Sequence, residues 1–199
     1  MLELRDITKS FPQQRVLEGI SLTVSDSESV AIMGPSGSGK STLLHCMSGV
    51  LVPDQGEVLF DDRDVAAMSD AERSRLRLEH FGFIFQDGQL LPELTATENV
   101  ALPQIMRGVS RSQAHNDAVD MLTRLGLGAY VDRYPGQLSG GQGQRVAIAR
   151  ALAGPPSVVF ADEPTAALDQ ATGHEVMQQI VAVCQKFGVT LVVVTHDPK

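Results

Sequence analysis

The sequence lacks the features of several common classes of protein. Its only two cysteines, Cys46 and Cys184, have no metal-binding or redox spacing, so both are expected to be reduced, buried thiols. Its apolar runs, such as Val189 to Val194, are far too short to cross a bilayer. The first residues carry no charged segment followed by an apolar core, so no secretion signal is expected. These absences predict a protein that stays in the cytoplasm.

Positive charge is scarce as well. There are 16 Lys and Arg residues against 24 Asp and Glu, and the net charge of −8 argues against a surface built for nucleic acid. We therefore expect no nucleic-acid partner. The chain has no internal repeat, low-complexity tract or flexible linker, and its 199 residues are enough for one domain with a sub-domain.

A phosphate-binding loop is the first positive signal. Residues 34–42 fit the pattern G-x-x-x-x-G-K-[ST], between an apolar strand at 30–33 and a helix at 40–48 that Gly49 can end. The glycines let backbone amides approach phosphates, Lys40 supplies a positive charge, and Ser41 can bind Mg²⁺. The alternative is a glycine-rich turn in an unrelated fold. The loop comprises Gly34, Pro35, Ser36, Gly37, Ser38, Gly39, Lys40, Ser41 and Thr42.

A second anion site follows at Leu138-Ser139-Gly140-Gly141-Gln142. Ser139 is a good N-cap, and two glycines expose backbone N–H groups at the positive end of a helix dipole. Two phosphate-directed elements in one small domain suggest that two chains contact two faces of one nucleotide.

Acidic and amide side chains stand at the ends of apolar strands. Val158 to Asp162 forms such a strand and Glu163 follows it, a pattern that also occurs in a simple solvated turn. Gln86 ends an aromatic strand, and His196 follows the strand at 189–195, where a lone histidine is often structural. ATP hydrolysis needs phosphate neutralisation, Mg²⁺ and an oriented water, which residues of these types can supply.

Taken in order, these motifs resemble the ATP-binding cassette (ABC) family, whose signature is LSGGQ. The resemblance covers nearly the whole chain. It implies that Asp162 supports Mg²⁺, Glu163 polarises the attacking water, Gln86 contacts the metal, and His196 reaches the γ-phosphate. It further implies ATP contacts from the phosphate loop, from Asp169 at the dimer interface, from Phe11 on adenine, and from Ser139, Gly140, Gly141 and Gln142 of a second copy. Taken alone, Asp169 also suits a helix N-terminus, and Phe11 also suits a core position.

The resemblance implies an α/β fold: a P-loop NTPase (RecA-like) core with an antiparallel β sub-domain and an inserted α-helical sub-domain. We expect one domain over 1–199, with the core at 1–86 and 155–199 and the helical sub-domain at 87–154. Strand signals lie at 1–7, 20–24, 30–33, 81–85, 158–162 and 189–195. Helices are expected from the capping box at Ser69, from Ser110 to Gly126, and from 139 to 154, with Pro92, Pro103 and Pro135 as breaks.

Residues 81–103 resemble more narrowly the lipoprotein-release and macrolide-export ATPases. This implies a motor subunit, a two-fold homodimer holding Mg²⁺ and ATP, which drives a permease of the FtsX or MacB type from the inner face of the cell membrane. The tract 90–103 would lie near that partner. The alternatives are a soluble ABC ATPase acting on DNA or ribosomes, and a small-molecule kinase, which would leave the signature and Asp169 unexplained.

Three positions depart from the family pattern. Gly143 stands where the family usually has Gln or Glu, which predicts a looser signature helix and slower turnover. Ser27 stands where Gly commonly precedes a Glu, which predicts a small change in that turn. The sequence ends at Lys199, where relatives continue, so we expect the end of the family domain to be missing, the last strand to expose apolar surface, and the stability to be lower.

Overall fold

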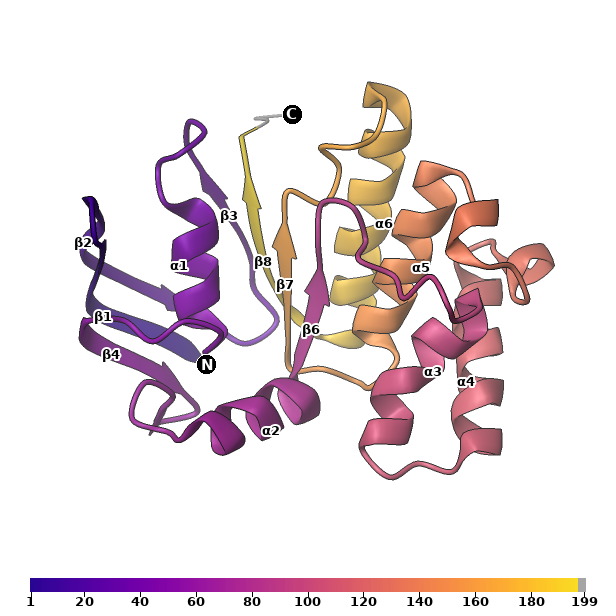
Figure 1. Cartoon of the computed structure of the whole chain (residues 1–199), viewed down its shortest axis with the longest axis horizontal. Coiled ribbons are helices and arrows are strands. Elements are labelled where there is room, and N and C mark those ends of the chain that lie inside the picture. Colours follow the sequence, from indigo (N-terminus) through magenta and orange to yellow (C-terminus); the bar gives the residue numbers. More distant parts are fainter. Residues whose placement is uncertain (197–199) are drawn as a thin grey trace.

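The computed structural model describes residues 1–196, which form two sheets and a layer of helices (Figure 1). The antiparallel sheet has the order β2-β1-β4-β5, and the parallel sheet has the order β3-β8-β7-β6. Its strands are β1 (Leu2–Phe11), β2 (Gln14–Val24), β3 (Ser29–Met33), β4 (Gln55–Phe60), β5 (Arg63–Asp64), β6 (Phe81–Ile84), β7 (Val158–Asp162) and β8 (Thr190–Thr195). Its α-helices are α1 (Lys40–Met47), α2 (Asp70–His80), α3 (Ala96–Met106), α4 (Arg111–Arg124), α5 (Gly140–Leu152) and α6 (Gln170–Phe187).

The two central strands of the parallel sheet are buried on both faces, whereas the residues of the edge strand β3 are exposed or half-buried. β7 and β8 are almost entirely apolar and buried, as expected for strands covered by helices on either side. Their register aligns the carboxyl ends of three strands, because Met33 pairs with Thr195 and Asp162 pairs with Val194. The predicted fold class is confirmed: an α/β P-loop NTPase core with an antiparallel sheet and added helices.

Two hydrophobic clusters hold these layers together. One joins the antiparallel sheet and α1 to one face of the parallel sheet, and it contains Cys46. The other joins the opposite face to the remaining large helices, and it contains Cys184. Both thiols are free and buried, as predicted, and burial raises the pKa of each to about 11.

The helices α3, α4 and α5 form a layer at one end of the molecule (Figure 1). Helix N-caps fall where the sequence predicts them, at Ser69, Ser110 and Ser139. Pro103 is a correction: it lies inside α3 rather than at a break. Tertiary packing of the apolar face of α3 keeps this helix continuous past the hydrogen bond that proline cannot make. The boundaries of the helical sub-domain at 87 and 154 stay a prediction.

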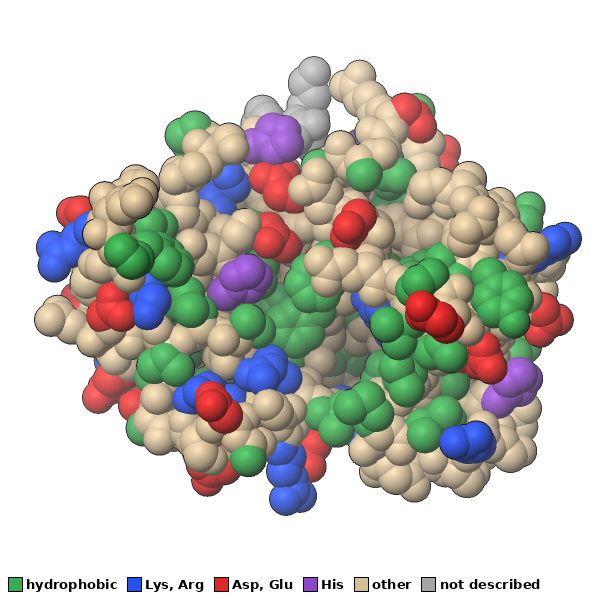
Figure 2. All heavy atoms as spheres, in the orientation of Figure 1, with side chains coloured by type: hydrophobic (Ala, Val, Ile, Leu, Met, Phe, Trp, Pro, Cys, Tyr) green, Lys and Arg blue, Asp and Glu red, His purple; other side chains and the backbone are tan. Residues whose placement is uncertain are grey.

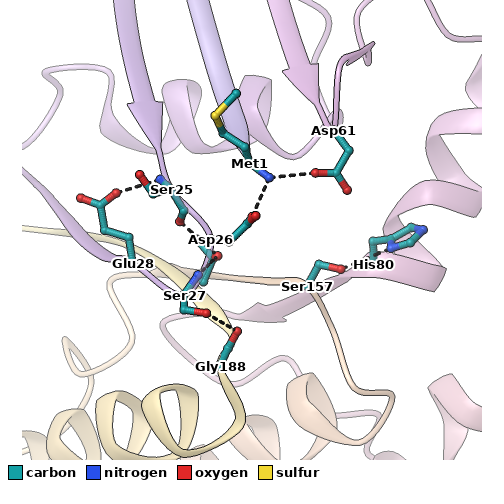
Figure 3. Close-up of polar contacts among 10 residues, drawn as sticks. Met1, Ser25, Asp26, Ser27, Glu28, Asp61, His80, Ser157 and Gly188 are labelled. Atoms are coloured by element: carbon teal, nitrogen blue, oxygen red, sulfur yellow. Dashed lines mark hydrogen bonds and ion pairs between the residues drawn. The ribbon is translucent and has the colours of Figure 1, made fainter.

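Hydrogen bonds and ion pairs connect the two sheets where β2 ends (Figure 3). Ser27 has a φ of +62°, and its hydroxyl donates to the Gly188 carbonyl at 2.9 Å, while its N–H donates to Thr190 Oγ1 at 2.9 Å. Beside it, the amine of Met1 lies 2.6 Å from Asp26 Oδ1 and 2.8 Å from Oδ1 of Asp61. The side chain of Ser27 therefore fastens its turn to the end of α6, which a glycine could not do.

The structure differs from the sequence prediction in the position of the edge strand. β8 lies between β3 and β7, so it does not expose apolar surface; the exposed apolar side chain at the edge is Met33 of β3. The strands β4 and β5 were not predicted, and of the helix α6 the sequence analysis gave only Asp169 as suited to a helix N-terminus. The expectation about the chain end lies outside the described residues. Among residues 1–196, no helix is long and apolar enough to span a membrane.

Candidate functional site

The phosphate loop joins β3 to α1, and its shape requires glycine at Gly39. This residue has a φ of +91°, and a Cβ there would lie 2.8 Å from Cγ1 of Val16, so the loop packs directly on β2. The Lys40 side chain, only 8% exposed, folds back over the loop. Its Nζ donates to the carbonyl oxygens of Gly34 at 2.8 Å and Pro35 at 3.0 Å. The lysine charge is thereby held within the concave side of the loop.

The acidic pair at the end of β7, Asp162 and Glu163, faces this loop. Ser41 Oγ donates to Asp162 Oδ1 at 3.0 Å, and Lys40 Nζ lies 3.9 Å from Glu163 Oε1. His196 Nδ1 lies 2.7 Å from the other carboxylate oxygen of Glu163. Glu163 has a φ of +47°, a strained backbone of the kind that occurs at functional sites. Residues from three strand ends and one helix are thus joined in one polar network.

The donor set beside Lys40 suits Mg²⁺. The Ser41 hydroxyl and the Asp162 carboxylate are hard oxygen ligands that already touch each other. Mg²⁺ keeps several waters and usually takes one or two carboxylates together with substrate phosphates. The residues present therefore fit this metal, and Gln86, exposed at the end of β6 beside β7, can supply an amide oxygen.

The signature residues lie at the start of α5 and form a separate hollow. Ser139 Oγ accepts from the N–H of Gln142 at 3.3 Å, which completes a capping box. A Cβ on Gly141 would lie 2.7 Å from Cγ2 of Thr172, so α5 and α6 approach too closely here for a side chain. Residues 139–142 line a hollow of about 420 Å³ with Asp169 and Thr172, and none of the described residues 34–42 lines it.

Asp169 caps α6 at the edge of the same hollow. Its carboxylate accepts from the Thr172 N–H at 3.1 Å, and hydrogen bonds from Thr172 lower its pKa. Phe11 ends β1 with its side chain 44% exposed, so it is not a core residue. In the phosphate loop Ser36, Gly37 and Ser38 are exposed, and Thr42 is half-buried on α1. The structure therefore brings Lys40, Ser41, Asp162, Glu163 and His196 together around the phosphate loop, and groups residues 139–142 with Asp169 around the signature.

Three side chains that the sequence analysis did not single out hold the segment after Gln86. Gln144 and Arg150 of α5 and Asn99 of α3 donate to backbone carbonyls between Phe85 and Thr95. The only feature of the sequence that could have identified these three residues is a polar side chain at a helix position where the apolar pattern predicts burial. Buried Gln, Asn and Arg side chains require hydrogen-bond partners, and exposed backbone of a loop can supply them.

A search against family models matches residues 17–166 to the ABC transporter family. This chain belongs to that family. The cassette is 46% identical to the lipoprotein-releasing system ATP-binding protein LolD of Myxococcus xanthus, over 99% of this chain and 90% of that protein. It is also 46% identical to the macrolide export ATP-binding/permease protein MacB of Marinobacter nauticus, over 100% of this chain and 31% of that longer protein.

Solved structures agree with this assignment. The dimeric ATP-binding cassette MJ0796, in a post-hydrolysis state bound to ADP and Pi, is 41% identical and superimposes with a TM-score of 0.89. The alignment covers 99% of this chain and 88% of that chain. The predicted resemblance to the ABC family, including its LolD and MacB members, is confirmed. The roles of the individual site residues stay predictions.

Proposed function

We propose that this cassette is the ATP-hydrolysing motor subunit of a bacterial ABC transporter or mechanotransmission complex. The proposal depends mainly on one observation: Lys40, Asp162, Glu163 and His196 lie together at the carboxyl ends of the parallel strands. That arrangement supports the proposal that Lys40 binds phosphate, Asp162 binds the metal and Glu163 is the base at one γ-phosphate.

In the proposed mechanism, backbone N–H groups of the phosphate loop, from residues 34 and 36–39, and Lys40 Nζ bind the phosphates of ATP. Lys40 Nζ then exchanges the carbonyls of Gly34 and Pro35 for β- and γ-phosphate oxygens. Ser41, Asp162 and Gln86 would hold Mg²⁺, which neutralises phosphate charge when it is bound. Phe11 would stack on adenine.

Glu163 is the proposed general base. Its carboxylate takes up a proton from the attacking water as the water oxygen bonds to the γ-phosphorus. The bond from the γ-phosphorus to the oxygen that bridges it to the β-phosphorus breaks, and ADP and phosphate leave. The contact between His196 Nδ1 and Glu163 supports the proposal that His196 holds the carboxylate rotamer and lies beside the γ-phosphate. A fixed carboxylate lowers the activation free energy because much of the catalysis of phosphoryl transfer comes from the correct positioning of the reacting groups.

Two copies, related by a two-fold axis, would complete each ATP site. The hollow around Ser139, Gly141 and Asp169 presents the amides of a helix N-terminus but is separate from the phosphate loop of its own chain. A second copy placed head to tail would bring these amides to the γ-phosphate on the first chain. The dimeric state of the related cassette MJ0796 supports this arrangement.

The proposed partner is an integral-membrane permease of the FtsX or MacB type, reached from the cytoplasmic face of the membrane. The names of the related LolD and MacB proteins support this choice. Two exposed apolar side chains belong to the region of the helical layer: Leu91, 42% exposed, precedes α3, and Met106, 63% exposed, ends it. On the face in Figure 2, hydrophobic side chains gather over this layer.

The test uses two variants. Glu163→Gln keeps the size of the side chain, so it should bind Mg·ATP, lose hydrolysis and accumulate as a dimer in size-exclusion chromatography. Lys40→Ala should fail to bind ATP and should stay monomeric. A Glu163→Gln chain with the wild-type ATPase rate would refute the assigned base.

The partner is tested by capture of Glu163→Gln with Mg·ATP from gently solubilised membranes. A polytopic partner supports the motor function. Recovery of ribosomes or DNA-bound proteins alone would favour the soluble ABC ATPase and refute the membrane assignment.

A further inference from the structure

The segment that carries Gln86 leaves the parallel sheet but is bound to the helical layer. Gln144 Nε2 of α5 donates to the Phe85 carbonyl at 2.9 Å. Arg150 of the same helix donates to the carbonyls of Gly88 and Gln89, each at 2.7 Å. Three carbonyls within five residues are therefore held by one helix, the signature helix.

The backbone of the segment is shaped for this contact. Gly88 has a φ of +69° and Gln89 a φ of +43°, and the two positive values present consecutive carbonyls to the forked guanidinium of Arg150. A Cβ on Gly88 would lie only 3.3 Å from Gln144 Oε1 and 3.5 Å from Cβ of Ala147. The strained turn is thus stabilised by close contact with α5 and by charge-assisted hydrogen bonds.

The far end of the segment is tied to α3. Asn99 is fully buried; its Oδ1 accepts from the Leu91 N–H at 2.8 Å, and its Nδ2 donates to the carbonyls of Leu91, Leu94 and Thr95 at 3.0–3.1 Å. Only the amino end of the segment continues into the sheet, through β6. Movement of α5 relative to the sheet would therefore carry the Gln86 segment with it.

We propose that Arg150 and Gln144 are positioning residues that fasten Gln86 to the signature helix, so that its amide follows α5. The proposal rests on the proposed function, in which Gln86 serves the ATP of its own chain. Ser139 at the start of the same helix serves the ATP of the second copy. One rigid helix then links the two ATP sites: when the signature end engages one nucleotide, the Arg150 end sets the Gln86 amide at the other.

The test compares Arg150→Lys with Arg107→Lys. Arg107 is a matched control because its guanidinium, like that of Arg150, donates to backbone carbonyls. Its three acceptors are the carbonyls of Leu78 and Glu79, each at 2.7 Å, and that of Gly154, and none of them lies in the Gln86 segment. Lysine keeps the charge in both variants and loses the fork. Both variants should lose stability, whereas only one should misplace Gln86.

For Arg150→Lys we expect kcat for ATP to fall about 10- to 100-fold, the scale of a misplaced catalytic group. The Kd of this variant for ADP, which has no γ-phosphate, should stay within about twofold of the wild-type value. Gln144→Ala should also lower kcat, but by a smaller factor. Arg107→Lys should keep kcat within about twofold at a temperature where it is folded. Equal kcat values for the two arginine variants, whether both low or both normal, would overturn the proposal.

Hydrogen exchange tests, in the absence of ATP, whether Arg150 holds the Gln86 segment on α5. Arg150→Lys should raise exchange at the amides of residues 86–91, and Arg107→Lys should not. Unchanged exchange in Arg150→Lys would overturn the proposal by itself. A wild-type chain that exchanges as expected but does not hydrolyse ATP would refute the proposed function instead, so the two failures are distinguishable.

Discussion

Gly143 offers a quantitative test of how the signature helix is built. It lies inside α5, where its N–H donates to the Ser139 carbonyl at 2.8 Å, and a Cβ added there meets no atom within 4 Å. Glycine in a helix costs about 0.5–1 kcal/mol relative to alanine because it loses more backbone entropy on folding. Gly143→Ala should therefore raise the free energy of unfolding by that amount, which corresponds to about 1–4 °C in Tm for a domain of this size.

Gly141→Ala is the matched control, because the same helix and the same propensity gain are involved. Its Cβ would lie 2.7 Å from Cγ2 of Thr172, a distance that side chains do not tolerate without movement. Overpacking of this kind typically costs about 1–3 kcal/mol, which exceeds the propensity gain. The two substitutions, two residues apart, should therefore change stability in opposite directions.

The assay is urea unfolding of the nucleotide-free protein, followed by circular dichroism, with the midpoint and slope fitted for each variant. A Gly143→Ala midpoint at or below that of the wild type would refute the reasoning, as would stabilisation by Gly141→Ala. The predicted functional consequence is tested with Gly143→Gln, which should speed ATP hydrolysis and ATP-driven dimerisation if a loose first turn slows turnover. Unchanged rates in a more stable protein would refute that link.

Two further predictions concern packing and pH. Gly82→Ala should lower the free energy of unfolding by about 1–3 kcal/mol, because its Cβ would overlap the carbonyl oxygen of Ala151. The urea midpoint should fall accordingly, and a midpoint unchanged from the wild type would contradict this. Burial raises the pKa of Cys46 and Cys184 from 9.0 to about 11, so between these values the folded state holds more protons than the unfolded state, and stability should fall as pH rises from about 9 to 11. Replacing both cysteines with alanine should flatten that part of the stability–pH curve, and an identical slope in the double variant would contradict the assignment.

Local motifs explain why much of the fold was predictable. The phosphate loop, the caps at Ser69 and Ser139, and the buried strand ending at Asp162 are determined by residues within a few positions of each other. The helix through Pro103 was mispredicted because packing of α3 overrides a local preference. The edge position of β3 could not be derived either, because strand order depends on contacts far apart in the chain.

The candidate site shows the same division. The sequence identified Lys40 and Glu163 by type and spacing, but it did not predict that His196 would contact Glu163 or that Lys40 would fold onto its own loop. The contacts of Arg150 with the loop after β6 span 61 and 62 residues of sequence, so no local pattern encodes them. Such contacts arise only when helix and loop are packed together.

The strained backbone of Glu163 has a clear physical purpose in this arrangement. A left-handed conformation costs a non-glycine residue about 1–2 kcal/mol, so surrounding contacts must hold it. The Glu163 N–H donates to the Val194 carbonyl at 2.9 Å, which ties the turn to β8, and His196 holds its carboxylate. The turn redirects the side chain from the strand axis toward Lys40. A one-residue slip between β7 and β8 would break the backbone hydrogen bond and move His196 away, so the register of two buried strands determines the position of Glu163, the proposed base.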